Sequence, residues 1–134
     1  MRIDEVEGIG AVQAAKLGEV GIGTTDDLIM AGATASGREK VSATTGISTH
    51  QLLKWVNHVD LMRVEGVGPE YADLLEAAGV DSPAELAQRN PANLAQTFQE
   101  IDAARPNWIR RLPSEASVTG WIASAKAMDK VVSH

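Results

Sequence analysis

The stretch VEGIG at positions 6–10 recurs almost unchanged as VEGVG at positions 64–68. In each copy, a hydrophobic residue is followed by an acid and then by two glycines that stand on either side of an aliphatic residue. Glycine tolerates positive φ, so such a stretch allows a sharp turn between two helices. We therefore predict two hairpin turns, the first at Gly8, Ile9 and Gly10 and the second at Gly66, Val67 and Gly68.

The similarity extends well beyond these turns. Residues 3–32 align without a gap with residues 61–90, and eight positions are identical. Self-similarity at a fixed spacing indicates a repeated structural unit. The identical pairs are Val6 and Val64, Glu7 and Glu65, Gly8 and Gly66, Gly10 and Gly68, Ala14 and Ala72, Leu17 and Leu75, Gly21 and Gly79, and Leu28 and Leu86.

Each copy predicts a short helix, the glycine turn, a second helix ended by glycine, and a third helix that begins with a capping residue. The caps are Thr24 in the first copy and Ser82 in the second, where Pro83 occupies the first helical position. A cap of this kind stabilises a helix by about 1 kcal/mol. Companion helices are expected over residues 36–46, 48–64, 90–104 and 114–128.

These patterns predict an all-α fold, because no segment alternates apolar and polar residues for long enough to form a strand. The 134 residues fit a single domain, 1–134. Within it we expect two pseudo-equivalent repeats, at about 1–60 and 61–130, packed around one core. Trp55 and Trp121 take equivalent places in the two repeats and are expected in the core.

The glycine turns resemble the helix-hairpin-helix motif of repair and recombination proteins. Longer stretches, such as LLKWVN at 52–57, ELAQRNP at 85–91 and LPSEA at 112–116, are similar to a bacterial family of tandem helix-hairpin-helix proteins of unknown function. The resemblance covers roughly residues 3–128. It implies a tandem helix-hairpin-helix fold and no assigned activity.

Composition narrows the class of protein. No cysteine is present, which excludes disulfides and thiolate metal sites and fits the cytoplasm. The chain contains no apolar run of about 18 residues, so no membrane span is expected. It begins MRIDEVEG, with acids where a signal peptide has its hydrophobic segment. We therefore expect a cytoplasmic protein.

Charge is distributed unevenly, within a total of −6. Residues 1–30 and 65–104, which contain the hairpin turns, carry −4 and −7, whereas residues 31–64 and 105–134 carry +2 and +3. Phosphate neutralisation dominates non-specific DNA affinity. The sequence therefore favours hairpin turns that serve as structural corners over turns that hold a phosphate.

The second turn shows the same bias locally. Pro69 removes one N–H donor, and Glu70 places a negative charge in the first helical turn, where a phosphate would otherwise bind. In the first repeat, a cluster of basic residues beside the turn would instead indicate that the turn binds nucleic acid.

The segment ARPNWIRRLP, residues 104–113, contains the eight extra residues that break the repeat. Arginine and tryptophan are common in interaction hot spots, and such a cluster can also stack on nucleic-acid bases. Alternatively, Trp108 and Ile109 fill the core while the arginines are solvated or paired with acids. The candidate contact residues of the chain are Lys16, Arg38, Lys40, Lys54, Arg105, Trp108, Arg110 and Arg111.

Two further patterns leave alternatives open. Residues 41–55 loosely fit a DNA-binding helix-turn-helix, or they form an ordinary helical corner. An acidic face docks a basic partner, or it keeps the protein soluble. This face comprises Asp73, Glu76, Asp81 and Glu85.

Nothing in the sequence indicates catalysis. His50 and His58 are eight residues apart, about 80° out of alignment on a helix, and His134 is remote in sequence. No phosphate-binding loop or dinucleotide motif is present. We expect no enzyme activity, metal, cofactor or small-molecule substrate. The expected function is a protein–protein adaptor, through a protein partner or self-association, and the alternative is DNA binding through the first hairpin or residues 105–111.

Overall fold

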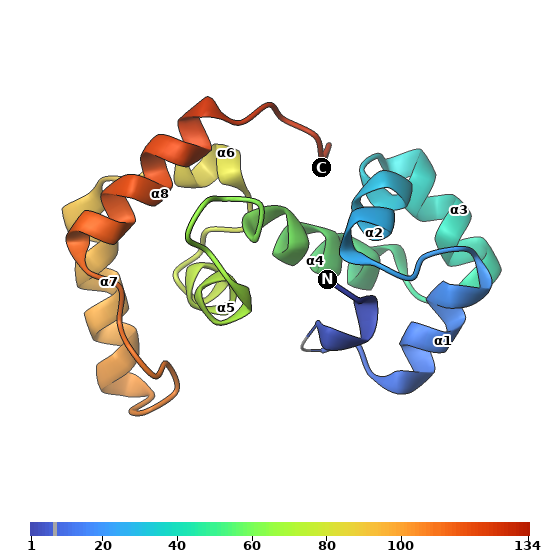
Figure 1. The fold of residues 1–134 in the computed structure, drawn as a ribbon, viewed down its shortest axis with the longest axis horizontal. Helices are drawn as coiled ribbons and strands as arrows, with labels where there is room; N and C mark the ends of the chain where they lie inside the picture. Colours follow the sequence, from blue (N-terminus) through green and yellow to red (C-terminus); the bar gives the residue numbers. More distant parts are fainter. Residues whose placement is uncertain (7) are drawn as a thin grey trace. The chain divides into compact units, whose positions relative to one another are not determined.

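The computed structural model describes residues 1–6 and 8–134 (Figure 1). It contains two compact units. Unit 1 comprises Met1–Val59 together with Val131–His134, and unit 2 comprises Asp60–Lys130. The C-terminal residues therefore belong to the same unit as the N-terminus.

The described residues are helical apart from loops and one isolated antiparallel bridge between Arg2 and Thr24. The predicted all-α class is confirmed. None of the described helices is both long and apolar enough to cross a membrane. The helices are η1 (Ile3–Glu5, a 3₁₀ helix), α1 (Ala11–Glu19), α2 (Thr25–Gly32), α3 (Ala35–Thr45), α4 (Thr49–Leu61), α5 (Pro69–Ala77), α6 (Pro83–Leu86), α7 (Pro91–Ala104) and α8 (Glu115–Ala127).

The helices of unit 1 begin and end where the sequence places their caps. At the start of α2, the Asp27 N–H donates to Thr24 Oγ1 at 3.1 Å. α3 ends at Gly46, which adopts a left-handed φ of 76°. At the start of α4, the Gln51 N–H donates to Ser48 Oγ at 3.1 Å. These contacts satisfy N–H groups that helix ends otherwise leave without partners.

The cap of α2 makes the stability of unit 1 depend on pH. Hydrogen bonds from the N–H groups of Gly23 and Thr24 hold the pKa of Asp27 below its ordinary value of 3.8. A folded-state pKa below the unfolded one stabilises the fold above pH 3.8, and this contribution is lost as the pH falls through the folded-state value. We expect Asp27→Asn to flatten the acid limb of the pH–stability curve, measured by urea unfolding between about pH 3 and 5. Asp26→Asn, on the same helix, controls for the change in net charge, and equal curves for the two variants would contradict the prediction.

In unit 1 the hairpin turn lies against a companion helix. Trp55 of α4 is 5% exposed, and its Nε1 lies 3.9 Å from where a Cβ on Gly8 would be. The buried hydrophobic cluster of this unit comprises Ile3, Val6, Ile9, Leu17, Ile22, Leu28, Ile29, Ile47, Leu52, Trp55, Val56, Val59 and Val132.

Three helices of unit 2, α6, α7 and α8, also start at side-chain caps. Ser82, Asn90 and Ser114 each accept a hydrogen bond from a backbone N–H at 3.1–3.2 Å. Proline occupies the first position of α5, α6 and α7, where the missing N–H costs nothing. The expected companion helices over residues 90–104 and 114–128 are confirmed as α7 and α8.

Unit 2 has a hydrophobic cluster of its own. Trp121 of α8 is 3% exposed, and its ring centroid lies 5.1 Å from that of Tyr71 and 6.4 Å from that of Phe98. The expectation of one shared core is therefore wrong, since the described buried hydrophobic residues form two clusters. The reason is local: each hairpin turn is covered by the tryptophan of its own companion helix, which closes a core within each unit.

Candidate functional site

The first hairpin turn is exposed and sharply bent. Gly8 has a φ of 91°, the buried Ile9 donates its N–H to the Val6 carbonyl at 3.1 Å, and Gly10 precedes the first turn of α1. That first helical turn contains no acidic residue, and Val12 within it is 65% exposed. The turn thus presents helix N–H groups beside an apolar side chain.

Asp4 and Glu5, two of the three acids before this turn, are engaged with Arg2. The Arg2 guanidinium lies 2.7 Å from the Asp4 carboxylate, and the Arg2 N–H donates to the Glu5 carboxylate at 3.1 Å. Glu7, the third acid before this turn, lies outside the described residues. The local negative charge before the turn is thus partly offset by Arg2.

The second hairpin turn has less capacity for an anion. Gly66 has a φ of 90°, and the Glu65 N–H donates to Ser124 Oγ at 3.1 Å. Pro69 supplies no N–H, and the Glu70 carboxylate lies in the first turn of α5, 3.6 Å from Arg110 Nε. An acidic residue in the first turn of α5 thus adds negative charge where an anionic ligand would need positive potential.

Arg38 does not belong to an exposed basic surface. Its residue is 4% exposed, and its two terminal nitrogens donate to the carbonyls of Gly32 and Ser133, each at 2.8 Å. The expectation that Arg38 lies on an exposed contact surface is therefore wrong, because its guanidinium is buried against two main-chain carbonyls of unit 1. The other basic candidates of this unit, Lys16, Lys40 and Lys54, are exposed on α1, α3 and α4.

The arginine loop, residues 105–111, joins α7 to α8 in unit 2. The Arg105 guanidinium stacks over the Trp108 ring at 3.8 Å from the ring centroid, and Asn107 between them has a φ of 67°. Ile109 is 6% exposed and belongs to the core cluster of the unit, and Trp108 packs against it half-buried. The interpretation in which Trp108 and Ile109 fill the core is thus confirmed for Ile109 and partly for Trp108.

α5 holds the far end of this loop. The Tyr71 hydroxyl donates to the Arg111 carbonyl at 2.9 Å, and the Arg110 side chain, 92% exposed, pairs only loosely with Glu70. Tyr71 is a residue that sequence reasoning missed, because its partner lies 40 positions away and no local pattern links the two. The loop therefore has a supported backbone and exposed arginine side chains.

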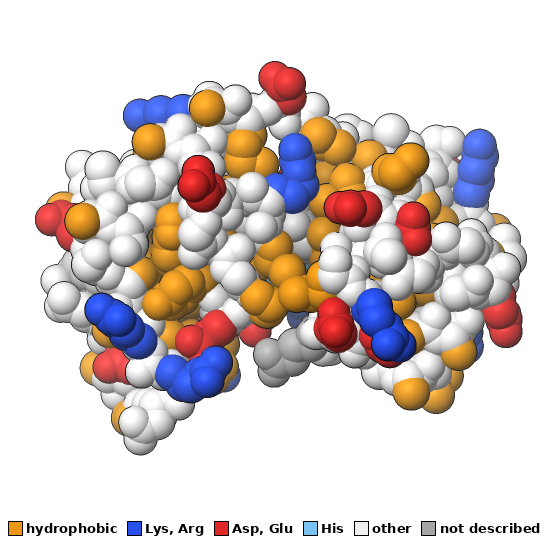
Figure 2. All heavy atoms as spheres, in the orientation of Figure 1, with side chains coloured by type: hydrophobic (Ala, Val, Ile, Leu, Met, Phe, Trp, Pro, Cys, Tyr) orange, Lys and Arg blue, Asp and Glu red, His pale blue; other side chains and the backbone are white. Residues whose placement is uncertain are grey.

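A pocket lies beside the end of the arginine loop, between α7 and the residues that lead into α8. Figure 2 shows Lys and Arg side chains near Asp and Glu side chains over the region that joins these two helices. The pocket lining is small, apolar or amide for the most part, which suits an inserted side chain of a protein. It comprises Ala92, Ala95, Gln96, Phe98, Gln99, Leu112, Pro113, Ser114 and Glu115.

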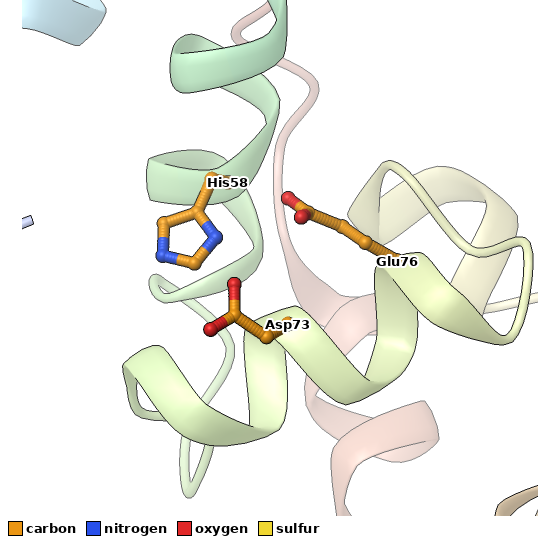
Figure 3. A group of neighbouring side chains, drawn as sticks. All are labelled: His58, Asp73 and Glu76. Carbon is orange, nitrogen blue, oxygen red and sulfur yellow. The ribbon is translucent and has the colours of Figure 1, made fainter. Parts of the chain in front are cut away.

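Two acids of α5 differ from expectation. Asp73 and Glu76 are each partly buried, whereas the sequence indicated an exposed acidic face. Figure 3 shows the two carboxylates on the same helix, α5, and labels His58, a buried residue of α4. Partial burial distinguishes these two carboxylates from the exposed acidic face that the sequence indicates.

The comparisons with known proteins identify a family and one partial relative. The chain is 36% identical over 53 residues to poly(3-hydroxyalkanoate) polymerase subunit PhaC of Haloarcula marismortui, a match that covers 40% of this chain and 11% of that protein. The chain thus spans about a tenth of the length of the curated relative it matches. No solved structure matches the chain. The family described as "Domain of unknown function (DUF4332)" matches residues 7–128, and the chain belongs to it.

Proposed function

We propose that this protein is a non-catalytic binding module built from two helix-hairpin-helix repeats. The support is the equivalence of local geometry at corresponding positions. Gly8 and Gly66 have φ values of 91° and 90°, and Gly21 and Gly79 have values of 82° and 87°. In each unit a tryptophan of a companion helix lies against the first of these glycines.

The module acts as a protein–protein adaptor, and its binding surface is the arginine loop with the adjoining pocket. The observation that carries this proposal is the anchored backbone of the loop. Because Ile109 is buried and Tyr71 binds the Arg111 carbonyl, the main chain of the loop is already held in place. Binding of a partner therefore costs little conformational entropy in the loop. Arginine and tryptophan side chains on such a support are typical of interface hot spots.

An acidic protein segment is the partner that this surface favours over a DNA duplex. Arg105, Arg110 and Arg111 offer positive charge, and the pocket beside them accepts an apolar or amide side chain. DNA binding through the first hairpin is the alternative, supported by its uncharged first helical turn. The buried Arg38 weakens that alternative, because it removes one of the four bases expected beside the turn.

The test compares an acidic peptide with nucleic acids as ligands of the full chain. Fluorescence anisotropy would be measured with a labelled peptide of alternating glutamate and leucine, a DNA duplex, a DNA single strand and a short RNA, each from about 25 to 200 mM salt. We expect the peptide to bind at micromolar concentration and the nucleic acids not to bind.

A pair of double variants locates the surface. Arg110→Ala/Arg111→Ala is expected to weaken peptide binding at least about thirtyfold, because each hot-spot arginine contributes on the order of 1–2 kcal/mol. The Arg111 substitution keeps the carbonyl that Tyr71 binds, so the loop backbone remains anchored. Lys40→Ala/Lys54→Ala removes the same charge from exposed positions of unit 1 and is the matched control.

Two outcomes would overturn the adaptor proposal. Nucleic-acid binding with a steep salt dependence, lost in Lys16→Glu, would establish the alternative at the first hairpin. Equal losses of peptide affinity in the two double variants would show that net charge, and not the arginine loop, drives binding. The polymerase match contributes no activity to the proposal, since it covers 11% of that protein.

A further inference from the structure

The C-terminal tail, residues 131–134, is bound to unit 1 like a short peptide ligand. Val132 is 2% exposed and lies in the hydrophobic cluster of unit 1, whereas its neighbour Val131 is 42% exposed. One side chain of the tail is therefore an anchor and the next faces solvent. This is the alternation of an extended segment laid along a surface.

The main chain of Ser133 supplies the polar contacts. Its N–H donates to the Ala33 carbonyl at 2.8 Å, and its carbonyl accepts from Arg38 Nη2 at 2.8 Å. Arg38 Nη1 binds the Gly32 carbonyl at the end of α2. The last carbonyls of a helix lack partners within the helix, and here Arg38 and the tail provide them. We call the surface formed by Gly32, Ala33 and Arg38 the tail groove.

An empty tail groove is unfavourable. Without the tail, the Ala33 carbonyl and one terminal nitrogen of the buried Arg38 lose their partners, and the space filled by Val132 opens. Yet a short segment held by one anchor side chain and a few hydrogen bonds opens without unfolding the rest of a protein. The groove is thus a preformed site that any segment with the same backbone and anchor can refill.

We infer that the tail groove binds the C-terminal tail of a second copy of this chain, so that the protein self-associates by exchanging residues 131–134. The occupant is identified by the structure, because a second copy carries the same valine and the same main-chain groups that already fit. Exchange of an identical segment between two copies is a low-cost route to symmetric dimers. The surface is separate from the arginine loop, so this inference does not depend on the proposed function.

Protein concentration decides whether each tail binds the groove of its own chain or the groove of a second copy. A tail joined through the short segment Met128–Lys130 competes within its own chain at an effective concentration in the millimolar range. Exchange is therefore expected to become measurable at several hundred micromolar protein, roughly within a factor of ten of that range.

Engineered cysteines test the exchange directly, because the natural chain has none. Full chains carrying Ala33→Cys would be mixed with full chains carrying Ser133→Cys, and disulfides between the two would be quantified by mass spectrometry. The control replaces the second chain by one carrying Thr119→Cys, on the exposed surface of α8. We expect about tenfold more of the mixed disulfide in the tail pair than in the control pair at about 0.5 mM protein.

A second variant separates groove binding from random collision. Adding Val132→Asp to the Ser133→Cys chain removes the apolar anchor and is expected to lower the mixed disulfide to the control level. A tail pair that forms no more mixed disulfide than the control pair would overturn the inference. The same conclusion would follow if Val132→Asp left the yield unchanged.

Discussion

Gly66→Ala is expected to lower the free energy of unfolding by about 3 kcal/mol, from two separate costs. A φ of 90° is unfavourable for any residue with a Cβ. A Cβ at this position would also lie 2.9 Å from Nε1 and 3.2 Å from Cδ1 of Trp121, closer than packed side chains allow. Because Trp121 packs between Tyr71 and Phe98 in the core of unit 2, its ring has little room to move. Urea unfolding followed by circular dichroism measures the loss.

The equivalent substitution in unit 1 is the matched control. Gly8→Ala incurs the same backbone cost, with a φ of 91°, but its Cβ would lie 3.9 Å from Trp55 Nε1, an ordinary contact. We expect a loss of only about 1–2 kcal/mol. Trp121→Phe, which removes the indole nitrogen, is expected to restore part of the difference in the Gly66→Ala background. Equal losses for the two glycines would show that the contact with Trp121 contributes nothing.

Arg38→Met is expected to destabilise unit 1 by about 2–4 kcal/mol. Methionine retains much of the packed stem but removes both terminal nitrogens. The carbonyls of Gly32 and Ser133 then lose their charged donor at a position that is 4% exposed. Buried polar groups without a partner carry their full desolvation cost. Thermal and urea unfolding of the full chain measure this loss.

Arg2→Met provides the comparison within the same unit. The Arg2 side chain is 74% exposed and pairs with Asp4 at the surface, so its removal is expected to cost less than about 1 kcal/mol. A similar small loss for Arg38→Met would mean that water satisfies the two carbonyls as well as the guanidinium does. That result would also contradict the argument that an empty tail groove is unfavourable.

Caps and hairpin glycines were predictable because their contacts are local in sequence. Thr24 and Asp27 bind each other across three residues, and Ser48 and Gln51 do the same. Gly8 and Gly66 were identified as turn residues because the same short stretch occurs twice. In such cases the hydrogen-bond partner lies within one helical turn, so residue type and spacing carry the information.

Burial of the candidate contact residues was not predictable in this way. Arginine is rarely fully buried, so the sequence predicts Arg38 among the exposed bases. Its partners are main-chain oxygens 6 and 95 positions away, which no side-chain pattern marks. The hydrogen bond between Tyr71 and the Arg111 carbonyl, 40 positions apart, is not predictable from the sequence for the same reason.

The sequence by itself determined the helical class, the positions of the turns and caps, and the internal repeat, since each depends on backbone preferences that act over a few residues. Only the tertiary structure decided that the buried hydrophobic residues form two cores. It also decided that Arg38 binds main-chain carbonyls and that residues 131–134 fill the tail groove of unit 1. These outcomes depend on which distant groups meet once each core closes. Every residue has the same main-chain carbonyl, so residue type does not reveal which carbonyl a distant side chain will bind. That pairing depends on which segments the folded structure brings together.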